Sequence, residues 1–96
     1  MSNKLGKSNY FYKLYRVKGS HGKVTTVSVD AFVALELCKL KKDPKIVSRL
    51  AREAAPKWER ADGTAPNRSV YVSNVLNAEL KRERAIKEAQ RAALAL

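Results

Sequence analysis

The chain has 96 residues and carries 20 Lys and Arg against 9 Asp and Glu, which gives a formal net charge of +11. This length corresponds to one small domain with a core of marginal stability, and the charge favours a polyanionic partner. No stretch approaches the ~20 apolar residues of a membrane span, and no apolar signal core follows the first lysines. We therefore expect a cytoplasmic protein. The single cysteine, Cys38, has no partner for an intrachain disulfide, which is consistent with a reducing compartment. Cys38 is expected to be a small core residue.

The positive charge is concentrated at the amino-terminal end of the chain. Residues 1–29 contain no acidic side chain, and Asp30 is the first carboxylate. Residues 1–9 are polar and without periodicity, which predicts a flexible basic arm, and residues 10–96 are expected to form a single domain with a long carboxy-terminal helix. The basic side chains of the first 29 residues are Lys4, Lys7, Lys13, Arg16, Lys18 and Lys23.

Two strands are predicted after the arm. Residues 10–17 are rich in aromatic side chains and residues 23–29 in Val and Thr, as strands prefer. Residues 18–22, Lys-Gly-Ser-His-Gly, are typical of a turn, so the pattern predicts an antiparallel β-hairpin. His21 is interpreted as an exposed loop residue and not as a catalytic base.

The hairpin is expected to lead directly into a helix over residues 31–41. Asp30 is a suitable N-cap because its carboxylate can accept bonds from the unpaired amides of the first turn. Residues 31–40 of this helix are apolar nearly all round, interrupted only by Glu36 and Lys39. Such a helix must be covered on more than one side, and a small monomer has little to cover it with. This helix therefore indicates a homodimer.

Two further helices are predicted. Asp43 and Pro44 have the pattern of a cap followed by a proline at the first helical position, and Pro56 should end or kink this second helix. Trp58 is expected to pack on the core. After a loop at residues 61–66, Asn67 or Ser69 should cap a long final helix with a charged, solvated end. The predicted fold class is α+β, a basic β-hairpin followed by three α-helices.

The residues do not favour an enzyme. One histidine and one cysteine without metal-ligand spacing make a zinc site implausible, and the four scattered glycines form no phosphate-binding loop of the known patterns. We expect no cofactor and no metal.

The basic hairpin has two competing interpretations. Its lysines could simply keep an exposed strand edge from pairing, but that device works with either sign of charge and no carboxylate is used here. Nucleic-acid binding is favoured for this reason. A membrane surface is disfavoured because its basic ligands usually carry their charge on an amphipathic helix.

Residues 24–30 with the apolar helix after them, and residues 67–76, resemble the strand and the two helices of ribbon-helix-helix DNA-binding proteins. The chain differs from that family by its first strand and an additional helix. The resemblance implies a homodimer that binds double-stranded DNA as a repressor or as a plasmid or phage accessory factor, with a strand in the major groove. It places Thr25, Val27 and Val29 towards the core.

The resemblance and the charge together imply a set of DNA-binding residues. Alternate side chains of the second strand would read bases, and the flanking Lys23 and Arg16 would contact phosphates or guanine edges. The amides of Arg68 and Ser69, at the start of the last helix, would clamp the DNA backbone. The candidates on the second strand are Val24, Thr26 and Ser28. The candidate cations are Lys13, Arg16, Lys18 and Lys23, and the candidates at the start of the last helix are Asn67, Arg68 and Ser69.

Three alternatives stay open at this level. Residues 50–55 and 72–77 are similar to the helices of a helix-turn-helix of the lac-repressor type, with the hairpin as a wing. An interaction or assembly module without a nucleic-acid role is another possibility. A basic aromatic hairpin could also stack the bases of RNA or single-stranded DNA.

Overall fold

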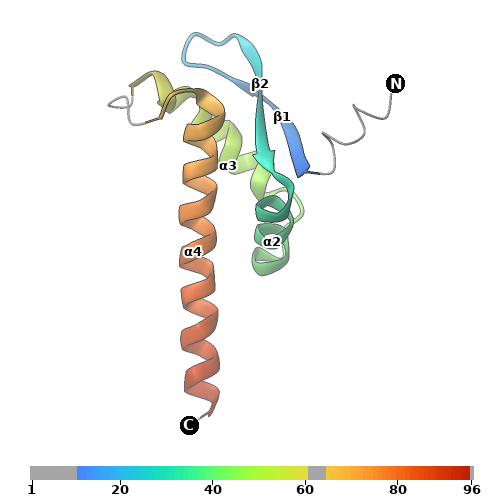
Figure 1. The fold of residues 1–96 in the computed structure, drawn as a ribbon, viewed down its shortest axis with the longest axis vertical. Helices are drawn as coiled ribbons and strands as arrows, with labels where there is room; N and C mark the ends of the chain where they lie inside the picture. The colour runs from blue at the N-terminus through green and yellow to red at the C-terminus, as the bar shows by residue number, and fades with distance from the viewer. Residues whose placement is uncertain (1–10, 61–64, 96) are drawn as a thin grey trace.

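The computed structural model describes residues 11–60 and 65–95. Its architecture confirms the α+β class, a two-stranded antiparallel hairpin followed by three α-helices (Figure 1). The predicted arm at residues 1–9, and most of the predicted loop at residues 61–66, lie outside the described residues. In chain order the elements are β1 (Tyr12–Lys18), β2 (Val24–Asp30), α2 (Ala31–Lys41), α3 (Ile46–Ala54), the 3-10 helix η1 (Ala55–Arg60) and α4 (Arg68–Ala95).

The hairpin pairs in register from Tyr12 opposite Asp30 to Lys18 opposite Val24. Its loop is closed by the amide of Gly19, which donates to the carbonyl of Lys23 at 3.0 Å. Gly22 has a φ of 82°, in the left-handed region that glycine adopts without strain. The loop chemistry read from the sequence therefore closes a hairpin within one chain.

The side chains of β2 alternate between core and solvent, as predicted. Val27 and Val29 are 0% and 1% exposed, whereas Val24 is 60% exposed and Thr26 also faces solvent. Thr25 is half-buried on the core side. This alternation follows from the period of two along a strand.

The helix boundaries follow local capping chemistry, with one correction. Asp30 caps α2 as predicted, accepting bonds from the amides of Phe32 and Val33 at 2.8 and 3.2 Å. The predicted start of the second helix at Asp43 and Pro44 is wrong, because α3 begins at Ile46.

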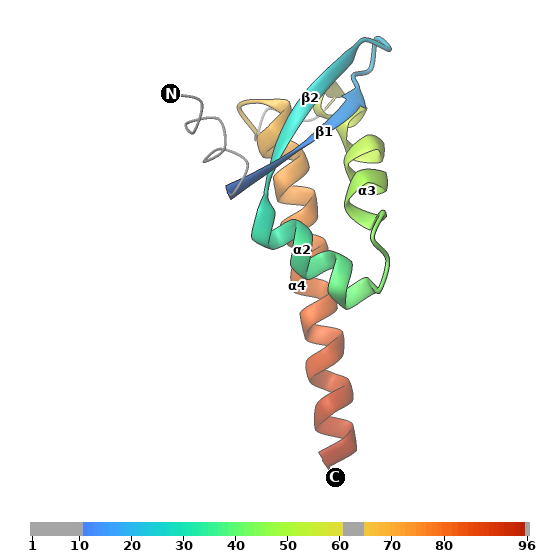
Figure 2. The ribbon, with the colours of Figure 1, turned by 90° about the vertical axis from the view of Figure 1, so that its right-hand side faces the viewer.

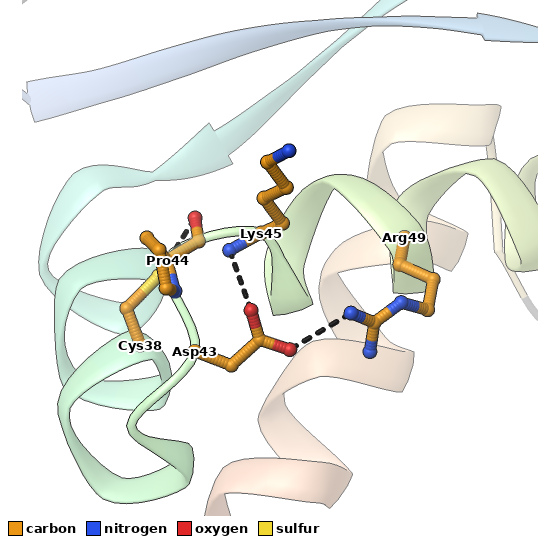
Figure 3. Close-up of polar contacts among 5 residues, drawn as sticks. All are labelled: Cys38, Asp43, Pro44, Lys45 and Arg49. Carbon is orange, nitrogen blue, oxygen red and sulfur yellow. Dashed lines mark hydrogen bonds and ion pairs between the residues drawn. The ribbon is translucent and has the colours of Figure 1, made fainter.

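Asp43 instead organises the turn before α3 (Figure 3). Its carboxylate accepts the amide of Lys45 at 2.9 Å and the guanidinium of Arg49 at 2.8 Å. The thiol of Cys38 donates to the carbonyl of Pro44 at 3.7 Å, and Cys38 is half-buried against the core. At the other end, α3 gives way to η1 just before Pro56, as that residue predicts.

The core lies where the hairpin, α2 and α3 meet the first half of α4. Leu37, Val47 and Leu76 are each at most 1% exposed and join Val27 there. The second half of α4 projects beyond the other elements (Figure 2), and its residues 84–95 are exposed, as expected for a solvated end. Among the described helices, none is long and apolar enough to cross a membrane.

Two apolar side chains of α2 stay uncovered. Phe32 is 70% exposed and Leu35 is 54% exposed, while Ala34 and Leu37 on the same helix are buried. The apolar circumference of this helix is therefore only partly covered within one chain.

The prediction that Trp58 packs on the core is wrong. Trp58 is half-buried, and its indole Nε1 donates to the carbonyl of Ala65 at 3.2 Å. The guanidinium of Arg68 lies over its ring, 4.9 Å from the centroid. Trp58 therefore supports the start of α4 from outside the core.

Candidate nucleic-acid interface

The hairpin presents one face to solvent, and the register defines its members. Residues directly opposite one another share a face of the sheet, so Arg16 lies with Thr26 and Lys18 with Val24. All four side chains are exposed. The loop half of this face therefore combines two cations with one hydroxyl and one branched apolar side chain. We call these four residues the basic face.

Two other predicted site residues lie apart from the basic face. Lys13 pairs with Val29 and so leaves the sheet on the core side, although its side chain reaches solvent. Ser28 shares the solvent face with the exposed Leu14 but is half-buried. Lys23 precedes β2 in the loop and is exposed beside the basic face.

The charge of the hairpin is not cancelled by carboxylates. Within the described parts of the chain, Lys13, Arg16, Lys18 and Lys23 have no carboxylate oxygen within 4.0 Å. Every ion pair there joins residues of the helices, η1 and the turn before α3. The paired residues are Lys41 with Glu79 and Glu83, Arg49 with Asp43, Arg68 with Glu59, Arg82 with Glu79, Arg84 with Glu36, and Arg91 with Glu88.

The start of α4 uses its polar side chains internally. The Asn67 side-chain oxygen accepts the amide of Val70 at 2.9 Å, which identifies Asn67 as the cap. The hydroxyl of Ser69 accepts the backbone amide of Ser28 at 3.0 Å. The side chains of Asn67 and Ser69 are therefore engaged within the protein, and Ser69 fastens β2 to α4. These bonds do not use the backbone amides of Arg68 and Ser69, so a phosphate clamp by those amides stays a prediction.

Arg68 is engaged in the same way. Its guanidinium forms an ion pair with Glu59 and stacks on Trp58. Partial burial tends to raise the pKa of Glu59, but bonds from backbone amides and from Arg68 outweigh it and hold that pKa below its usual value. A Cβ added to Gly19 would lie 2.9 Å from both charged side chains. The ion pair thus sits directly against the hairpin loop.

The tertiary structure adds one residue to the candidate interface. Arg52, on α3, lies with Arg16 and Lys18 around a hollow of ≈ 530 Å³. In the sequence Arg52 is one of several cations on the polar side of a predicted helix, and no local pattern connects it with a strand more than 30 residues earlier. Only the packing of α3 beside β1 brings these cations together.

The described residues contain no group of three His, Cys, Asp or Glu side chains placed to hold a metal ion. His21 is exposed in the hairpin loop and lines a smaller hollow of ≈ 280 Å³ with Lys23, Arg68 and Glu59. No protein-family model, curated protein or solved structure matches this chain.

Proposed function

We propose that this chain is a sequence-preferring, double-stranded DNA-binding protein that acts through the basic face of its hairpin. The observation that carries the proposal is the charge of Arg16, Lys18 and Lys23 on a structured ribbon, where no carboxylate of residues 11–60 or 65–95 forms an ion pair with them. A two-stranded β-ribbon fits the width of the major groove, and cations without carboxylate partners lose no ion pair when they meet phosphates. Binding of this kind is what a cytoplasmic repressor or accessory factor requires.

The residues at the basic face would make two kinds of contact, with phosphates and with bases. Lys18 and Lys23 would neutralise phosphates without regard to sequence. Thr26 faces solvent beside Arg16, and its hydroxyl and methyl can contact base edges and a thymine methyl. Arg16 can contact either a phosphate or a guanine edge. The proposal needs only the hairpin of one chain, because β2 is paired along its length with β1.

The salt dependence of duplex binding tests the electrostatic part. Each phosphate contact contributes about 0.9 to the slope of log affinity against log salt. We therefore expect a steep slope for the wild type and a slope shallower by roughly 1.8 for the double variant Lys18→Gln, Lys23→Gln. A control that removes the same charge from exposed positions of α2 and α4, Lys39→Gln with Lys81→Gln, should keep the slope. Equal slopes for both double variants, or no duplex binding by the wild type, would refute the proposal.

A binding selection from random duplexes tests the reading part. Thr26→Ala should relax the selected consensus, because it removes the hydroxyl between the cations. Asn74→Ala, on an exposed position of α4, should leave the consensus unchanged. The opposite result would favour the helix-turn-helix alternative.

We also propose that the protein acts as a homodimer. The support is the exposure of Phe32 and Leu35 on α2. A second subunit would remove these two large apolar side chains from water. Sedimentation at micromolar concentration should give a dimer, and Phe32→Glu should give a monomer that still folds. A strictly monomeric wild type would remove this part. A protein partner retained at high salt without any duplex binding would instead favour an assembly module.

A further inference from the structure

Three cations from two separate elements surround one hollow beside β1. Arg16 and Lys18 come from β1, and Arg52 comes from α3. The remaining lining is apolar, from the buried Val17 and the exposed Val24. Among the residues that the structure describes, no carboxylate lines this hollow of ≈ 530 Å³. We call it the cationic hollow.

The position of Arg52 is held without loss of its charge. Its Nη1 donates to the hydroxyl of Ser48 at 3.1 Å, one turn earlier on α3. A hydroxyl orients the guanidinium but does not neutralise it, and the other N–H groups of the fork stay available. The dipole of α3 accounts for one cation in its last turn, but it does not account for two further cations from a neighbouring strand.

Gathering three positive groups around an apolar floor is electrostatically unfavourable until an anion joins them. A bound anion relieves the mutual repulsion of these three exposed cations. Two guanidinium groups offer paired N–H donors that match the oxygens of a phosphate, and the ammonium of Lys18 adds a point charge. The chemistry of the hollow therefore selects a phosphate group.

We propose that the cationic hollow binds a backbone phosphate of the polynucleotide and so sets the position of the hairpin on the duplex. This inference rests on the proposed function, because Arg16 and Lys18 belong both to the basic face and to the hollow. It assigns a task to α3, which neither the charge pattern nor the hairpin alone suggests. Phosphate contacts of this kind position a protein, while base contacts supply specificity.

The test compares single-charge variants in duplex binding across about 50 to 300 mM salt. Arg52→Gln should lower the salt slope by about 0.9, so that raising the salt from about 50 to 300 mM weakens duplex binding by the variant about fivefold less than it weakens binding by the wild type. Lys81→Gln removes one exposed positive charge from α4, outside the hollow, and should leave the slope unchanged. Arg52→Lys keeps the charge and should keep most of the slope. The consensus selected from random duplexes should be the same for all of these proteins, because a phosphate contact carries no base information.

The outcomes separate this inference from the proposed function. If the wild type binds duplex steeply but Arg52→Gln behaves like Lys81→Gln, the hollow is not a phosphate site and the basic face alone binds DNA. If the wild type binds no duplex, both proposals fail. The side-chain Nε–H resonance of Arg52 distinguishes the sources of phosphate, because it should shift with duplex at micromolar concentration and barely with inorganic phosphate or a mononucleotide. Equal saturation by inorganic phosphate would overturn the assignment to the backbone. Circular dichroism of each variant confirms that it is folded.

Discussion

The substitution Ser69→Ala tests whether Ser69 serves the fold or touches DNA. Its hydroxyl accepts the amide of Ser28 at 3.0 Å and is the side-chain bond that ties β2 to α4. Removing it leaves a half-buried N–H on the outer edge of β2 without this partner. An unsatisfied buried donor costs about 1–3 kcal/mol. Because the amide of Ser28 is only half-buried, we expect Ser69→Ala to lower the free energy of unfolding by about 1–2 kcal/mol.

Urea unfolding and amide hydrogen exchange measure this effect. In a domain of this size each kcal/mol lowers Tm by roughly 4–8 °C, and the amide of Ser28 should lose protection selectively. Ser73→Ala is the matched control, since Ser73 is also a half-buried serine of α4 and its hydroxyl has no hydrogen bond within the described residues. Ser69→Thr should restore most of the stability by keeping the hydroxyl.

Two results would refute the reasoning about Ser69. The first is an unfolding free energy and a Ser28 exchange rate that do not change in Ser69→Ala. The second is an unchanged stability together with a duplex salt slope lower by about 1, which would mean that Ser69 contacts a phosphate directly.

Two further predictions concern the turn before α3 and the core. The pKa of Asp43 lies below its usual value because its carboxylate accepts bonds from the amide of Lys45 and the guanidinium of Arg49. The ionised carboxylate therefore stabilises the fold above about pH 4, the usual pKa of an aspartate in an unfolded chain. This stability is lost as the pH falls through the lower pKa of the folded state. Thermal unfolding should therefore show Asp43→Asn less stable than the wild type at pH 7, with a difference that shrinks towards pH 3, and a difference independent of pH would contradict the assignment. Leu76→Ala, at a position that is 0% exposed, should cost about 2–5 kcal/mol in urea unfolding, whereas Leu14→Ala, at 64% exposed, should change stability by less than about 0.5 kcal/mol; similar losses at both positions would mean that Leu14 is covered in solution.

Features that depend only on neighbouring residues could be predicted from the amino-acid sequence. The glycines of the hairpin loop, the cap at Asp30 and the alternation of Val27 and Val29 are all read over a few positions. Capping and strand periodicity are local because the bonded groups lie within one turn of helix or on adjacent residues. The charge asymmetry of residues 1–29 is likewise a property of the chain and needs no fold.

Contacts between residues far apart in the chain could not be predicted in this way, because they depend on how the elements pack. The same hydroxyl at Ser69 can cap a helix, bind a phosphate or accept the amide of β2, and the packing of the hairpin on α4 selects the last. Packing likewise places Arg52 beside Arg16 and leaves Phe32 uncovered. Such contacts depend on how elements distant in sequence are oriented, since residue type and spacing describe only the face of each element. The basic hairpin is thus a sequence property, while the three-cation hollow beside it is created by the fold.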